Sequence, residues 1–160
     1  QRDSNLSLKS QLDNRLRLSS AAYYYDYRDL QVIKQDVVEG IGLNTFVNAD
    51  KARAMGVELE AQALPVPEVM LSGTYSYNNT EFDEFFTKDA NACTLGPLAQ
   101  GNGQNPLCTQ EQDLNGNEFA LTPVHKASLN ATYFWNLFDL DWSATVSYIY
   151  TGEQWMTPFN

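Results

Sequence analysis

The chain has 160 residues, of which 43% are hydrophobic, and its formal net charge is −10. This excess of acidic over basic residues argues against a nucleic-acid-binding protein, because such a protein needs a basic face to release the counterions of the phosphates. No apolar run approaches the ~18 residues of a membrane helix, so the sequence excludes a helical membrane span.

The first predicted hairpin covers about residues 6–33. Leucines at even positions precede a turn at Asp13-Asn14, and a long run without a helix stop follows from Arg15 to about Ile33. Apolar residues recur at every second position on both sides of the turn, which places them on one face of a sheet. The alternation blurs over residues 21–27, where aromatic residues occupy both faces. The apolar set is Leu6, Leu8, Leu12, Leu16, Leu18, Ala22 and Tyr24.

The second predicted hairpin follows a long connection at about residues 34–44. Its first strand runs from about Asn44 to Leu64, its turn spans Pro65 to Glu68, and its second strand begins at Val69. Alternation with a period of two fits these runs better than helical spacing does. The apolar set is Val57, Leu59, Ala61, Ala63, Val69, Leu71, Gly73, Tyr75 and Tyr77, and it alternates with a mostly polar set that includes Glu58 and Glu60.

A second long connection covers about residues 83–118 and is rich in Gly, Asn and Gln. A connection of this length is usually functional or disordered. We interpret its two cysteines, Cys93 and Cys108, as a disulfide formed in an oxidising compartment. A metal site is the poorer alternative, because no further Cys or His lies nearby. The candidate ligand contacts are Phe82, Asp83, Glu84, Phe85 and Phe86, and the alternative is that this loop only covers the mouth of a barrel.

The third predicted hairpin turns at about Asn136 to Asp139. Alternation continues through both of its strands, and only Ile149 breaks the polar set of the second one. The apolar set is Ala127, Leu129, Ala131, Tyr133 and Trp135 before the turn, and Leu140, Trp142, Ala144, Val146, Tyr148 and Tyr150 after it.

These patterns predict an all-β fold, an antiparallel up-and-down transmembrane β-barrel segment of about six long strands in three hairpins. Runs of nearly twenty residues exceed both the ~5–6 residues of average strands and the ~9–11 that cross a bilayer. Short turns alternate with long loops, as periplasmic turns and extracellular loops do in outer-membrane barrels. Tyr and Trp are expected to form girdles at the membrane interfaces, with ordinary cross-strand aromatic pairs as the alternative. We expect these side chains to face lipid: Leu59, Leu71, Leu129 and Val146.

The sequence does not assemble the groups that catalysis requires. His125 stands alone near a strand start, without a nucleophile motif. Glu58 and Glu60 share one strand face, and on a barrel that face looks into a wet lumen, where acids are expected without catalysis. The acids near Asp83 lack the spacing of a calcium-binding loop. The sequence therefore predicts no enzyme activity, no cofactor and no metal site.

The segment Ala54-Met55-Gly56-Val57-Glu58-Leu59-Glu60 resembles a signature strand of the TonB-dependent outer-membrane receptors. In that family a Gly-hydrophobic-Glu-hydrophobic-Glu strand follows a lead-in with Asn and Ala, here residues 48–53. Three other segments are similar to family segments in the correct order, namely Ala21 to Val32, Tyr75 to Phe82, and Leu121 to Lys126. The resemblance implies structural roles for the motif residues Gly56, Glu58, Glu60 and Pro123.

The resemblance implies that residues 1–160 are part of a barrel of about 22 strands with a plugged lumen. The plug domain and the terminal strands are expected in other parts of a longer protein. The implied function is TonB-energised import of a siderophore-iron complex, cobalamin or a carbohydrate across the outer membrane of a Gram-negative bacterium. The implied partners are outer-membrane lipid, the rest of the barrel and its plug, TonB and a small extracellular ligand. The alternatives are a passive porin wall and a soluble extracellular carbohydrate-binding β-sandwich.

Overall fold

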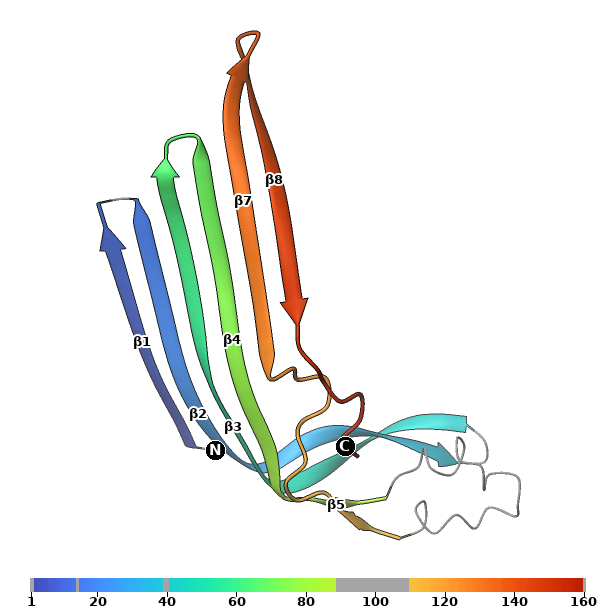
Figure 1. Cartoon of the computed structure of the whole chain (residues 1–160). Coiled ribbons are helices and arrows are strands. Elements are labelled where there is room, and N and C mark those ends of the chain that lie inside the picture. Colours follow the sequence, from blue (N-terminus) through green and yellow to red (C-terminus); the bar gives the residue numbers. More distant parts are fainter. Residues whose placement is uncertain (1, 14, 39–40, 89–109, 160) are drawn as a thin grey trace.

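The computed structural model describes residues 2–13, 15–38, 41–88 and 110–159, with the backbone alone for residues 2, 33–38, 41–45 and 47. Six long strands form one antiparallel sheet in which each strand pairs with the next one along the main wall (Figure 1). The strands are β1 (Arg2–Leu12), β2 (Leu16–Val38), β3 (Ile41–Val66), β4 (Val69–Glu84), β7 (His125–Leu137) and β8 (Leu140–Thr151). Two short strands, β5 (Phe86–Thr87) and β6 (Gln112–Asp113), form a separate sheet. The described part of the chain is therefore all-β, an open meander that does not close on itself.

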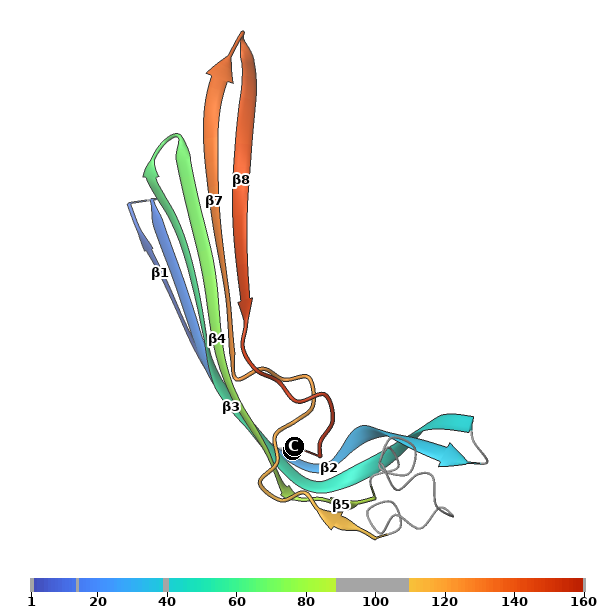
Figure 2. The ribbon, with the colours of Figure 1, turned by 45° about the vertical axis from the view of Figure 1, so that its right-hand side comes forward.

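The three predicted tight turns lie together at one end of the sheet, here called the short-turn end (Figures 1 and 2). Asp13 at the first turn and both Phe138 and Asp139 at the third have positive φ angles of 47–58°. Positive φ at two successive residues matches the twist of a two-residue hairpin. Within the described residues, no helix has the length and hydrophobicity of a membrane span.

The prediction of a long connection at residues 34–44 is wrong. β2 continues to Val38 and β3 begins at Ile41, with antiparallel pairing from Leu16↔Ala63 to Val38↔Ile41. These two strands contain 23 and 26 residues, so their hairpin extends far beyond the neighbouring strands. The pairing of β2 with β3 continues from the sheet into this segment, so its backbone groups are satisfied without a further neighbouring strand. The opposite end of the sheet, which carries this extension together with residues 85–88 and 110–124, is called the loop end.

The register brings the apolar sets of all the strands onto one face. Leu59 lies opposite Tyr75, and Leu71 lies opposite Ala131, which in turn pairs with Val146. The four side chains predicted to face lipid are 42–73% exposed, and none is covered by a second sheet or a helix in the described part of the chain. This arrangement contradicts the β-sandwich alternative, which requires a sealed layer over these residues.

The wall bends sharply where the hairpin extension begins, and Figure 2 shows the extension leaving the plane of the sheet. Asp29 on β2 has a φ of 57°, in the left-handed region that Asp tolerates better than most residues. On β4, Asp83 is an extra residue in a bulge, because Ala52 pairs with Phe82 whereas Lys51 pairs with Glu84. Bulges bend a strand and increase its twist. The two irregularities lie at the same level of adjacent strand pairs and account for the bend.

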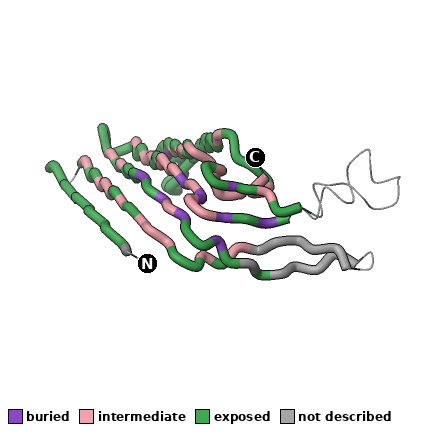
Figure 3. The backbone as a smooth tube through the Cα atoms, turned by 90° about the horizontal axis from the view of Figure 1, so that it is seen from below, coloured by how far each residue is buried: buried purple, intermediate pink, exposed green. Residues whose placement is uncertain are grey.

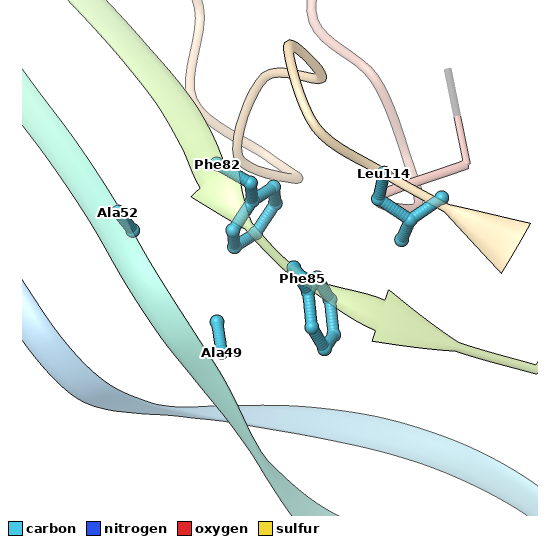
Figure 4. Packing of buried hydrophobic residues seen from close by; sticks show 5 residues of the cluster. All are labelled: Ala49, Ala52, Phe82, Phe85 and Leu114. Carbon is cyan, nitrogen blue, oxygen red and sulfur yellow. The ribbon is translucent and has the colours of Figure 1, made fainter.

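Buried residues gather at the loop end, whereas β1 and β8 are exposed along their length (Figure 3). The buried hydrophobic group, here called the loop-end cluster, draws on β3, on β4 and the residue that follows it, and on the chain after β6. Figure 4 shows how its five members converge. They are Ala49, Ala52, Phe82, Phe85 and Leu114, with Tyr27, Leu30, Val32, Phe119 and Phe159 packed against them.

Candidate functional site

The face opposite the apolar set is polar and carries cross-strand hydrogen bonds. Thr74 Oγ1 lies 2.7 Å from Ser128 Oγ, and Thr132 Oγ1 lies 2.9 Å from Thr145 Oγ1. Glu58 and Glu60 belong to this face and are exposed on it, as the sequence predicted. An apolar outer face with a polar inner face is the pattern of a barrel wall between lipid and a wet lumen. We call these the outer and inner faces.

A row of three tyrosines follows β2 along the inner face. The ring centroids of Tyr23 and Tyr25 are 5.2 Å apart, and those of Tyr25 and Tyr27 are 5.8 Å apart. The Tyr23 hydroxyl donates to Asn78 Oδ1 on β4. These three tyrosines cannot join the girdle that we expected Tyr and Trp to form at the membrane interfaces. Strand alternation leaves only Tyr24, among the tyrosines of residues 23–27, on the outer face.

Gly56 lies beneath this tyrosine row, which explains why the motif residue is a glycine. A Cβ atom at this position would meet the Tyr77 carbonyl oxygen and the Tyr23 ring. The Tyr23 side chain can reach Asn78 across β3 only because Gly56 offers no side chain in its path. The sequence motif is thus a packing requirement of the inner face.

Aromatic side chains mark both ends of the outer apolar band. At the short-turn end, Trp135 pairs directly with Trp142 across β7 and β8. At the other end the Tyr75 hydroxyl lies 2.9 Å from His125 Nδ1, and Tyr77 contacts the His125 ring at a centroid distance of 5.4 Å. Trp135 and His125 are ten positions apart on β7. At ~3.4 Å per residue and a tilt of ~40° this gives ~25 Å, the height of the apolar band of an outer-membrane barrel.

A charged patch lies on the outer face just beyond the aromatic level at the loop end. Lys51 Nζ donates to Glu84 Oε2 at 2.6 Å, and Arg53 Nη2 donates to Glu81 Oε2 at 2.7 Å. Arg53 Nε also lies 3.5 Å from Asp83 Oδ1. The hydrogen bond and the negative charge of Glu84 raise the pKa of Lys51 above its usual range. Such a concentration of charge indicates that the wall has left the apolar layer at this level.

The structure separates the five candidate ligand contacts into three environments. Phe82 and Phe85 are only 1% and 2% exposed, and they pack within the loop-end cluster. Asp83 and Glu84 are engaged by the cations of the charged patch. Phe86, by contrast, is 55% exposed. The prediction that these residues contact a ligand stays a prediction, and only the Phe86 ring is largely uncovered.

Cys93 and Cys108 lie outside the described residues, so their predicted disulfide stays a prediction. His125 begins β7 as expected, and Pro123 precedes it in the chain that leads into that strand. The Pro123 carbonyl accepts a long hydrogen bond of 3.5 Å from Asn78 Nδ2. Across the described ranges, no three His, Cys, Asp or Glu side chains form a group that could hold a metal ion.

Sequence reasoning missed the part played by Leu114 and Phe159 at the loop end. Leu114 is 3% exposed, and its amide donates to the Phe85 carbonyl at 2.9 Å. Phe159 packs against the same cluster from the segment after β8. Both residues stand outside any alternating pattern, so no periodic signal could have found them. An isolated apolar residue in a polar loop is the single available hint.

Residues 4–160 match the family described as TonB dependent receptor-like, beta-barrel. Among solved structures, the chain is similar to the crystal structure of BauA, the ferric preacinetobactin receptor from Acinetobacter baumannii, with a TM-score of 0.63 and 16% sequence identity. That similarity covers 98% of this chain but 19% of the receptor, and at such identity it supports the fold alone. A search of curated proteins found no match. Because the family match spans almost the whole chain and the two faces have the polarity of a barrel wall, the chain belongs to the TonB-dependent receptor β-barrel family.

Proposed function

We propose that this chain forms part of the wall of an outer-membrane receptor that imports a scarce extracellular ligand with energy supplied through TonB. The observation that carries the proposal is the continuous outer apolar band, whose large side chains stay exposed while the opposite face is polar. A bilayer is the environment in which such a face is stable. The short-turn end then faces the periplasm and the loop end faces the outside of a Gram-negative cell.

The rest of the barrel and a plug domain are the proposed partners within the intact receptor. Among the described residues, β1 and β8 each pair on one side only, and unpaired strand edges attract further strands. Their continuation by neighbouring strands would close the wall. The polar inner face, with Glu58 and Glu60, would then border a plug rather than open water. TonB would act through the plug and not through the residues of this segment.

The proposed ligand belongs to the class of ferric siderophores, with cobalamin and carbohydrate as the other classes. The first class is put forward by analogy with the ferric preacinetobactin receptor, whose fold is similar. Phe86 is the proposed contact residue, because its ring is exposed at the loop end. Asp83 and Glu84 would contribute negative charge beside it, and a disulfide between Cys93 and Cys108 would restrain the loop that follows.

Uptake by the intact receptor tests this function. A strain that lacks its own receptors would express the intact protein and receive radiolabelled ferric siderophores, cobalamin or oligosaccharides in separate assays. We expect saturable uptake of one class that disappears in a strain without TonB. Phe86→Ala should weaken uptake, whereas Phe138→Ala at the short-turn end should leave it unchanged.

A passive porin is the second candidate, because its wall would have the same two faces. It predicts uptake that rises linearly with ligand concentration and does not depend on TonB. Such a result would replace the import proposal. Failure to bind or take up any of the three ligand classes would also contradict it.

A further inference from the structure

The bend at Asp29 changes which residues of the β2–β3 hairpin face inward. Tyr27 belongs to the inner face by strand alternation, and the next inward-packing residues are Leu30 and Val32. The step from 27 to 30 is odd, so the left-handed residue between them has reversed the facing of the strand. Without this reversal, Leu30 and Val32 would point outward at the level of the charged patch.

The reversal lets the hairpin extension, residues 30–38 and 41–49, lean over the inner face. Ala49 from the extension is fully buried against Phe82 and Phe85, as Figure 4 shows. The rings of Phe82 and Phe85 lie 4.9 Å apart, and Phe119 lies 4.8 Å from Phe82 on another side. Phe82 therefore packs in one cluster with Ala49 of the extension and also contacts Phe119 in the connection that leads to β7.

Backbone hydrogen bonds hold that connection beside β4. Gly116 N donates to the Phe82 carbonyl at 2.8 Å, and Phe82 N donates to the Asn117 carbonyl at 3.0 Å. The Asn117 amide side chain donates to the Pro158 carbonyl at 2.9 Å, which adds the segment after β8. Three segments far apart in the sequence thus meet around one pair of phenylalanines.

We propose that Phe82 and Phe85 are positioning residues that join the hairpin extension and residues 110–119 into one cover over the inner face, with its pivot at Asp29 and Asp83. The loop-end cluster ties the cover into one unit, because it is the sole buried apolar contact among the described residues of these segments. Phe86 is carried on this unit. The inference rests on the fold and not on the identity of the ligand.

Hydrogen exchange followed by mass spectrometry tests the inference on the intact receptor in lipid nanodiscs without added ligand. In Phe82→Ala, peptides that contain residues 27–32, 46–51 and 110–119 should all exchange faster by about tenfold or more, since a large cavity weakens every contact of the cluster. Wall peptides 57–63 and 127–133 should keep their protection. Acceleration limited to the peptides around residue 82 would overturn the inference.

Two further variants separate coupling from general damage. Phe46→Ala removes a ring of the same kind from the extension, but this ring is 67% exposed, so exchange should stay unchanged. Leu114→Ala perturbs the cluster from the opposite side and should accelerate the same three peptide groups, including residues 27–32. If Leu114→Ala affects residues 110–119 alone, the segments are independent and the inference is wrong.

Discussion

The outer band and the loop-end cluster use the same kinds of side chain under opposite conditions. In the band, Leu129 and Val146 are 60% and 73% exposed, whereas Phe82 in the cluster is 1% exposed. In the proposed membrane setting, lipid replaces protein as the neighbour of the band, so the residues of the band need only be apolar and need not interlock. The cluster lies beyond the lipid and must exclude water by close packing. Large-to-small changes should therefore destabilise the cluster, whereas apolar-to-polar changes should destabilise the band.

The largest effect is expected for Phe82→Ala. The substitution leaves a cavity in a packed site, and such changes typically cost ~3–5 kcal/mol. Denaturant unfolding of the intact receptor in lipid vesicles measures the change in free energy. The neighbouring Phe86→Ala removes an exposed ring and should cost less than ~1 kcal/mol. Equal losses for the two variants would show that the cluster is not a packed core.

Leu129→Arg should have the next largest effect, because it places a charge on the lipid face. A cation near the middle of the band costs ~2–4 kcal/mol in outer-membrane barrels. The same vesicle unfolding experiment measures this loss. Ser147→Arg on the inner face of β8 is the matched control and should be nearly neutral. A larger loss for Ser147→Arg than for Leu129→Arg would show that the inner and outer faces are exchanged, and the apolar band would not face lipid.

Gly56→Ala should destabilise the wall by ~1–3 kcal/mol, because the new Cβ meets a backbone oxygen that cannot move independently. Gly73→Ala is the control, since its Cβ would approach the end of the Leu129 side chain at 2.9 Å, and that side chain can turn away into lipid. The shifts in the thermal unfolding midpoint of the two variants compare a position on the inner face, where the backbone cannot adjust, with one on the outer face, where a side chain can move. Identical shifts would contradict that difference.

Asp29→Val should loosen the pivot by ~1–2 kcal/mol, because a β-branched residue disfavours the left-handed conformation. Asp29→Gly accepts this conformation and should retain the bend. Limited proteolysis of residues 46–51 in the intact receptor reports whether the extension stays docked. Equal cleavage of the two variants would show that the φ angle of Asp29 does not maintain the bend.

The smallest effect is expected at the ion pair between Lys51 and Glu84, because both side chains are exposed. The pair raises the pKa of Lys51, so its contribution is complete below the ordinary lysine pKa and disappears as the pH rises through the raised value. The unfolding midpoint of the wild type should therefore approach that of Lys51→Met at strongly alkaline pH. A gap between them that persists there would assign the effect to packing.

The sequence by itself determined the strands, their tight turns and the two faces of the wall, because alternation is a local property of an extended chain. Leu59 and Glu58, as successive residues of a strand, point to opposite faces wherever that strand lies in the fold. It also determined that Leu129 and Val146 share one face, since the turn between β7 and β8 sets the register of that hairpin.

Tertiary structure alone decided the length of the β2–β3 hairpin, the bend at Asp29 and the burial of Phe82 and Phe85. A single left-handed residue reverses the facing of a strand. Odd and even positions then exchange faces at that residue, so the alternation before it does not predict the faces after it. The cluster and the residues packed against it come from positions more than a hundred apart, from Tyr27 to Phe159, and no local pattern specifies such contacts. The physical reason is that hydrophobic burial depends on which surfaces meet in space. Strand facing is local, because successive side chains of an extended chain point to opposite faces.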